Sequence, residues 1–499
     1  MILRVQMKFV QSRPKHKSVA LMMLLLCLLV LNPQAGQASD DQSDANSPTN
    51  RKPLDVIISA VIANPDLKPL TRKALSPKDR KGPLQFYGQD SLTKPLLEAY
   101  LDRAIVHMSA SSYPPSLWKE RSRKFLNDTG AKFIHWADIG WVRRYAPENW
   151  TKLTDQIDAV HNTDYGADVL FECGVMEAVG KIQIDSTPIP KWLLTVLTDT
   201  GIQDKRKIGP NGKEFFSYEA MFDRNAEDWP KKYVGLWNAD PAFEQSVPDL
   251  TMLETQIYYA YLIAEYIDSG FEGVMFGQTM LTGARDKDNA ALNSICNFAR
   301  RWAAARGYRK AVTLTSHVNR NTDYPKSNGK PIFTHITWPS RLSVRNDEPL
   351  VLQFGPDVKA KGHRQSGEQI VGLLKLDHDL PILLEIDNYS RRNGPSAVCD
   401  EGYDEITGYA VQSPEQRSEF LKHYYFECRK WRDKDGNARV HLAMPGHRCL
   451  NVPVSLYTLE NGEPSPPTSF YWPYKEEGGE EETIKELFQK ARMPGEFAK

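Results

Sequence analysis

The sequence predicts an α/β fold of the (β/α)8 (TIM) barrel class. Short apolar runs of strand length end in polar, aromatic or acidic residues, and segments able to form helices follow them. Strands that alternate with helices are typical of parallel βαβ units. Eight such runs are present, which is the number that a closed barrel needs. Because a barrel builds its site at the carboxyl ends of its strands, we expect functional side chains there.

The N-terminus predicts export. A basic region with Arg4 and Lys8 precedes the apolar stretch 19–31, and Gly36 and Ala38 supply small residues at a cleavage site. We predict a signal peptide over 1–38 and a secreted or periplasmic protein. The stretch is shorter than the roughly 20 residues of a membrane span, so we expect no stable membrane anchor, with an uncleaved anchor as the alternative.

The remaining chain divides into three predicted parts. Residues 39–53 are rich in Ser, Asp, Asn and Pro and are expected to be a disordered linker. Residues 54–455 hold the barrel, and 456–499 form a C-terminal tail packed on it. The predicted strands are 105–109, 133–138, 169–175, 234–238, 273–278, 312–315, 382–387 and 440–444. Helical patterns include 252–269, 290–306 and 413–432.

Two connections are too long for simple crossovers. They are 180–232, after the third strand, and 319–380, after the sixth. Both leave the carboxyl end of a strand, where substrate-binding loops accumulate. The second contains the apolar runs 332–338 and 350–354, which either are inserted strands or displace the predicted seventh strand.

The composition favours a carbohydrate partner. Basic and acidic residues balance at 63 each without a long basic run, which argues against nucleic acid. Aromatic residues make up 10% of the chain, with eleven Trp, and several follow strands. Flat aromatic faces suit sugar rings, although aromatic residues are also ordinary core residues. No P-loop, Gly-rich nucleotide loop, HExxH motif or GxSxG motif is present, so we predict no cofactor.

Strand alternation sorts the polar residues. In 382–387 the apolar set Ile382, Leu384 and Ile386 is predicted to face the outer helices, so Glu385 and Asp387 point into the barrel. Buried carboxylates need a counter-ion, a proton or a function. The structural alternative is that an arginine or a histidine neutralises Glu385. The same alternation along 312–318 predicts that His317 points inward at the barrel mouth, where a histidine can bind substrate or a metal.

Other strand ends supply further candidates. Glu177 lies at or just past the end of the third strand, whereas Glu172 lies deeper in it. Glu272 opens the fifth strand and is left out of the site. The predicted substrate-binding residues are Asp138, Trp141, Trp237, Asn238, Asp240, Gln278, His317 and Asp387.

Two carboxylates across a barrel mouth fit glycoside hydrolysis. One protonates the leaving oxygen, and the other attacks the anomeric carbon or activates water. We predict Glu385 as the nucleophile or base and Glu177 as the general acid, with no metal. The strand plan from about 54 to 455, and especially 381-PILLEIDNYS-390, resembles the secreted (β/α)8 glycoside hydrolases. Where a large clan of these enzymes has an Asn-Glu pair, this chain reads 237-WNAD-240, so only the acid of 382–387 is carried over.

Two other classes stay open. A metal-dependent barrel hydrolase or isomerase is the first alternative, because suitable oxygen and nitrogen ligands are present: His107, His135, His317, Asp138, Glu385 and Asp387. A carbohydrate-binding barrel without catalysis is the second.

Overall fold

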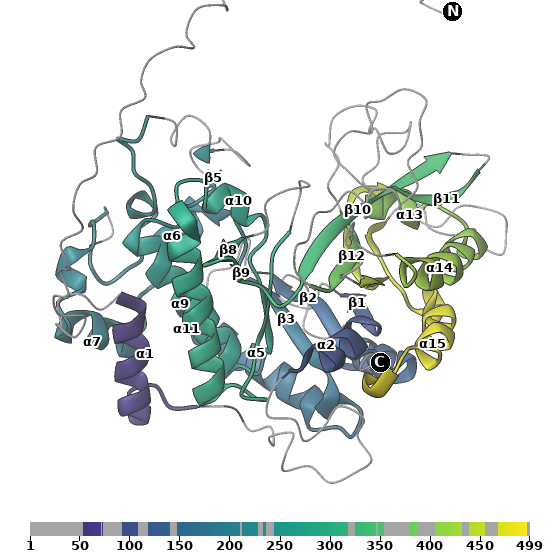
Figure 1. Ribbon diagram of the computed structural model, residues 1–499, viewed down its shortest axis with the longest axis horizontal. Helices are drawn as coiled ribbons and strands as arrows, with labels where there is room; N and C mark the ends of the chain where they lie inside the picture. The colour runs from purple at the N-terminus through teal and green to yellow at the C-terminus, as the bar shows by residue number, and fades with distance from the viewer. Residues whose placement is uncertain are drawn as a thin grey trace, which may run out of the picture. The chain divides into compact units, whose positions relative to one another are not determined.

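The computed structural model has a mixed α/β fold (Figure 1). It describes residues 53–70, 72, 92–107, 118–139, 147–209, 212–227, 233–235, 244–317, 325–345, 348–353, 380–387, 405–431, 439–454 and 468–496. The predicted signal peptide, the predicted linker up to residue 52 and Trp141, Trp237, Asn238 and Asp240 lie outside these ranges. No helix among the described residues is long and apolar enough to cross a membrane.

A six-stranded sheet forms the first half of the strand arrangement. Every neighbouring pair in it is parallel, as the βα alternation predicts. Its order is β14 (Met444–Pro445), β1 (Ala104–Val106), β2 (Phe133–Ile139), β3 (Leu170–Gly174), β6 (Gly273–Met275) and β7 (Thr313–Thr315).

A four-stranded sheet follows. Its order is β11 (Glu348–Gln353), β10 (Ile336–Arg345), β12 (Ile382–Ile386) and β13 (Val440–Leu442). β12 pairs in parallel with both β10 and β13, whereas β11 is antiparallel to β10. A parallel bridge between His317 and Thr337 joins the end of β7 to β10, and only Ala443 separates β13 from β14. These two features connect the four-stranded sheet to the six-stranded sheet at β7 and at β14.

The predicted fourth strand, 234–238, is wrong. Val234 and Gly235 lie in a turn, and Gly235 has a φ of 70°, which a strand does not adopt; the rest lies outside the described residues. β3 pairs directly with β6. β10, which begins in the apolar run 332–338, supplies a parallel strand in place of 234–238. The run 332–338 is therefore an inserted strand, and the predicted seventh strand is kept as β12.

Helices flank the strands. α9 packs against α11, as Figure 1 shows, and the predicted helices 252–269, 290–306 and 413–432 are confirmed as α9, α11 and α14. The α-helices are α1 (Pro53–Ala63), α2 (Lys94–Leu101), α4 (Arg123–Thr129), α5 (Pro147–His161), α6 (Lys181–Asp185), α7 (Lys191–Asp199), α9 (Leu253–Asp268), α10 (Thr279–Thr282), α11 (Ala290–Arg306), α13 (Glu405–Ala410), α14 (Pro414–Cys428) and α15 (Glu481–Gln489). Short antiparallel pairs are β4 (Val179–Gly180) with β5 (Gln245–Ser246), β8 (Lys326–Ser327) with β9 (Lys330–Pro331), and β15 (Arg448–Val454) with β16 (Thr468–Tyr471).

Adjacent strand residues alternate between two buried apolar clusters. The inner cluster contains Val106, Phe133, Leu170, Met275 and Leu383, together with side chains of α2. The outer cluster contains the alternate strand residues, among them Ile105, Ile134, Phe171, Val274, Ile382 and Leu384, together with side chains of α9, α11 and α14. The predicted outward face of β12 is therefore confirmed, and Glu385 shares the inner face with Leu383.

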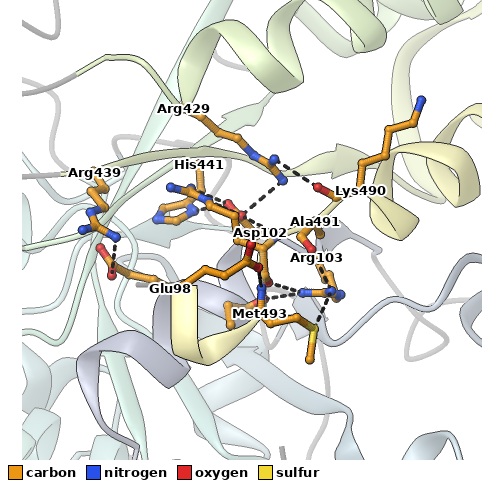
Figure 2. Close-up of polar contacts among 12 residues, drawn as sticks. Glu98, Asp102, Arg103, Arg429, Arg439, His441, Lys490, Ala491 and Met493 are labelled. Atoms are coloured by element: carbon orange, nitrogen blue, oxygen red, sulfur yellow. Dashed lines mark hydrogen bonds and ion pairs between the residues drawn. The ribbon is translucent and has the colours of Figure 1, made fainter. Parts of the chain in front are cut away.

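The C-terminal segment is held by a buried carboxylate. Asp102, directly after α2, lies with Arg429 and His441 (Figure 2) and also accepts hydrogen bonds from Arg492 at 2.9 and 3.0 Å. Arg103 donates to the carbonyl oxygen of Arg492 at 2.8 Å. These contacts attach the end of the chain to the start of β1.

The cysteines with a free thiol in the described part of the chain are all buried. Cys173, Cys296 and Cys428 are buried free thiols. Cys428 therefore forms no disulfide, although export to an oxidising compartment would permit one.

Candidate active site

A chain of buried acidic and imidazole groups runs across the inner face of the strands. Glu385 on β12 accepts a hydrogen bond from His135 Nε2 on β2 at 3.0 Å. The other nitrogen of His135 donates to Glu172 on β3, and His317 Nε2, after β7, donates to the second oxygen of Glu385. Glu172, His135 and Glu385 are fully buried. Strand alternation places all of them on one face, but only the pairing of the strands brings them into contact.

His135 is held in its charged form. A neutral imidazole has one N–H, so donation to two carboxylates requires the imidazolium. Burial opposes that charge, but Glu172 and Glu385 outweigh it and raise the pKa of His135 to about 9. Burial likewise opposes the charge on His317, and Glu385 raises its pKa.

The two predicted catalytic acids have pKa shifts of opposite sign. Burial by itself would raise the pKa of Glu385, but the charges of His135 and His317 hold it well below its usual range. At Glu177, burial dominates and raises the pKa, with His317 opposing only in part. The environments of the two carboxyl groups therefore favour an ionised Glu385 and a protonated Glu177.

Glu177 lies in the bend after β3, at the carboxyl end where the sequence placed it. It is buried, and the backbone N–H and the side-chain amide of Gln278 donate to its carboxyl oxygens at 3.2 and 3.0 Å. Tyr259 on α9 donates to the carbonyl oxygen of Met176 at 2.8 Å. Gln278, predicted to bind substrate, thus contacts the predicted acid directly.

The side chains of Asp387 and His317 lie close to that of Glu385. Suitable atoms of the three side chains lie within 4.8 Å of one another, and Arg448 Nη2 donates to Asp387 at 2.9 Å. Arg448 also lies over the ring of Trp136, 5.1 Å from its centroid. The sequence did not identify Arg448, because nothing local marks an arginine that pairs with a residue 61 positions away.

A bulge in β2 places Trp136 beside this group. Between Ile134 and Asp138 the register of β2 against β3 shifts, and Trp136 has a φ of 60°, a strained backbone conformation for a large side chain. Its ring centroid lies 5.5 Å from that of His317. The inner face therefore carries an aromatic wall next to the carboxylates.

Asp138 lies elsewhere. It accepts a hydrogen bond from Tyr266 on α9 at 2.8 Å, so its carboxylate contacts an outer helix. Glu272 precedes β6 and pairs with Arg309 at 2.8 Å, away from the strand ends where Glu177 and Asp387 lie, as predicted. The structure thus brings together Glu385, His317 and Asp387, and separately Glu177 with Gln278.

Among the described residues, His317, Glu385 and Asp387 also form a group whose ligand atoms lie close enough together to hold a metal ion. Here His317 is already hydrogen-bonded to Glu385, and Arg448 pairs with Asp387. A divalent cation would have to displace both contacts. The donor set therefore fits a charged hydrogen-bond network better than a preformed metal centre.

Gly277 is expected to be essential for the position of Glu177. It has a φ of 58°, and a Cβ there would overlap the Glu177 carboxylate. We expect Gly277→Ala to lose more than the roughly 1–2 kcal/mol of backbone strain and to abolish most activity. Gly329→Ala is the matched control, because Gly329 has a φ of 74° but open space around its Cβ position. Urea unfolding and a rate assay of both variants measure this; equal losses would refute it.

Comparisons with known proteins add little to this geometry. No protein-family model matches the chain, and no curated protein matches its sequence. Among solved structures, the glycoside hydrolase domain of PelA from Pseudomonas aeruginosa matches with 11% identity and a TM-score of 0.28, and a variant of that domain with 12% and 0.29. Both matches cover 68% of this chain and 94% of the other. The function proposed below therefore rests on the residues of this chain.

Proposed function

We propose that this protein is a glycoside hydrolase with a closed (β/α)8 barrel. The barrel consists of β1, β2, β3, β6, β7, β10, β12 and β13 with β14. Support comes from the parallel pairings, the bridge between His317 and Thr337, and the single residue between β13 and β14. In such a barrel Glu177 and Asp387 lie at the carboxyl ends, where substrate binds.

The opposite pKa shifts of Glu177 and Glu385 carry the proposal. A pair of carboxyl groups whose environments separate their pKa values provides one acid and one base. Glu177 is the general acid that protonates the glycosidic oxygen, and Glu385 is the carboxylate that attacks the anomeric carbon or activates water. The separation of the two carboxyl groups sets retention or inversion, which the anomeric configuration of the released sugar reports.

The surrounding residues bind the sugar. His317, Asp387 and Gln278 offer hydrogen-bonding groups at the mouth, with Trp136 as the aromatic wall. Trp141, Trp237, Asn238 and Asp240 remain proposed substrate-binding residues, whereas Asp138, whose carboxylate contacts α9, is no longer proposed. The protein acts outside the cytoplasm after removal of 1–38, on a poly- or oligosaccharide.

Activity is expected to fall at the alkaline side with the titration of Glu177. The acid must be protonated in the free enzyme, and its raised pKa keeps it protonated to higher pH than an ordinary glutamate. The value of kcat/KM should therefore decline as pH rises through that pKa. A pH profile of the unmutated protein tests this. An alkaline limb that persists unchanged in Glu177→Gln would assign it to another group.

The direct test is release of sugars from a polysaccharide panel by the purified mature protein. Release identifies a glycosidase. A metal-dependent hydrolase is the second candidate, favoured by the three ligand atoms within 4.8 Å of one another. It predicts stoichiometric metal in the protein and loss of activity with a chelator. Binding without release would leave a carbohydrate-binding barrel.

A further inference from the structure

We propose that Glu172 is a positioning residue of the proposed active site and acts on Glu385 through the ring of His135. Glu172 lies on β3, His135 on β2 and Glu385 on β12. The inference rests on the proposed function, in which Glu385 is the reacting carboxylate. Glu172 is fully buried within β3, before the strand end that Glu177 follows, so its role does not require contact with substrate.

The ring of His135 is held from two sides. Its Nδ1 donates to Glu172, and its Nε2 donates to Glu385 at 3.0 Å. Because both nitrogens belong to one rigid ring, the contact with Glu172 fixes the direction in which Nε2 points. His135 is fully buried, so solvent cannot replace Glu172 as the acceptor for Nδ1. Loss of that acceptor would remove one of the two hydrogen bonds that orient the ring.

The neighbouring strand leaves space for Glu172. Gly273 of β6 is its register partner, and a Cβ on Gly273 would lie 2.9 Å from Cβ and Cγ of Glu172. The other carboxyl oxygen of Glu172 lies 3.7 Å from Nε2 of His335. Burial and the charge of His135 lower the pKa of His335 to about 3, so His335 stays neutral. The charged imidazole that contacts Glu172 is therefore His135.

Glu385 has a second contact of a different kind. His317, after the end of β7, donates to its other oxygen and lies close to Asp387. In the proposed function His317 also binds the sugar, so its contacts change when substrate enters. His135 lies within β2 and keeps its two carboxylate partners. The pair of Glu172 and His135 therefore supplies the fixed reference for the Glu385 carboxylate.

Two substitutions separate positioning from packing. Glu172→Gln keeps the length of the side chain and a carbonyl oxygen that accepts from His135, whereas Glu172→Met keeps the length but offers only a weak acceptor. Glu272→Gln is the matched control, because Glu272 is also a fully buried glutamate but pairs with Arg309 at 2.8 Å, outside the site. Burial raises the pKa of Glu272 to about 7, so a neutral side chain there costs little near neutral pH.

The first measurement reports on the ring and needs no substrate. NMR of the mature protein with ¹⁵N-labelled histidines shows which ring nitrogens carry protons, and His135→Gln or His135→Asn assigns the signals. We expect N–H signals from both nitrogens of His135 at pH 7. Glu172→Gln should shift the Nδ1–H signal, Glu172→Met should abolish it, and Glu272→Gln should leave it in place. An unchanged Nδ1–H signal in Glu172→Met would overturn the positioning role.

The second measurement is the rate of sugar release on the substrate that the unmutated protein degrades best. Glu172→Met should lower kcat about 10²-fold, the usual cost of displacing a reacting group by about 1 Å, with little change in KM. Glu172→Gln should retain more activity than Glu172→Met. A packing role predicts the reverse order, because apolar side chains replace buried ion pairs well. Glu272→Gln should keep its kcat per folded molecule.

The two measurements distinguish the possible failures. An unchanged kcat in Glu172→Met would overturn the positioning role and leave the proposed function intact. If the NMR signals of His135 respond as expected but the unmutated protein releases no sugar, the orientation of His135 by Glu172 is supported and the proposed function fails.

Discussion

Glu177→Gln is expected to lower the rate of sugar release by about 10²–10⁴-fold, the usual contribution of a general acid. The substitution keeps the size of the side chain, but the amide cannot deliver a proton to the glycosidic oxygen and can accept only one of the two hydrogen bonds that Gln278 donates. Glu385→Gln is expected to be at least as severe, because it removes the negative charge that both His135 and His317 contact. Rates are measured on the polysaccharide that the unmutated protein degrades best.

Substrate choice separates the two roles. A sugar with an activated leaving group needs little acid assistance, so Glu177→Gln should recover much of its rate on such a substrate, whereas Glu385→Gln should not. Glu214→Gln is the matched control, since Glu214 is an exposed glutamate outside the site. Full activity of folded Glu177→Gln and Glu385→Gln would refute both roles. If Asp387→Asn alone abolishes activity, Asp387 is the reacting carboxylate.

Asp102→Asn is expected to destabilise the fold by about 3–5 kcal/mol, the usual result of removing one partner of a buried ion pair. Asp102 is 2% exposed and lies with Arg429 and the buried His441 (Figure 2). It also accepts a hydrogen bond from Arg492. The neutral amide leaves these cationic and polar groups without their anion and loosens the C-terminal segment. Urea unfolding measures the change in the free energy of unfolding.

The pH dependence identifies the cause. Burial would raise the pKa of Asp102, but His441, Arg492 and Arg429 lower it overall. A depressed folded pKa stabilises the protein above the unfolded pKa of about 3.9, and this contribution disappears as pH falls below it. The difference between Asp102→Asn and the unmutated protein should therefore shrink at acid pH. Asp204→Asn, at an exposed pair with Lys213, should change little. A pH-independent difference would indicate lost packing instead.

Local pattern located most of the strands. The apolar runs 133–138 and 382–387 predict β2 and β12, because a parallel strand that is buried on both faces consists mainly of apolar residues. The run 234–238 is equally apolar, yet Gly235 adopts a positive φ and the adjacent described segment is a turn. Residues 336–338 form the start of β10, where they pair in parallel with β12. Strand propensity is local, but strand pairing depends on the partner.

In the candidate site too, the sequence predicts single side chains, whereas the tertiary structure determines their contacts. Alternation along β12 by itself determined that Glu385 faces inward, since its neighbours Leu384 and Ile386 must be buried against the outer helices. The ends of the apolar runs in the sequence also placed Glu177 and His317 near strand ends. Only the tertiary structure decided which groups meet: His135, 250 positions from Glu385, and Arg448, which pairs with Asp387. Charge and protonation depend on these distant partners and on burial, so the proposed acid and base roles rest on the fold and not on any local motif.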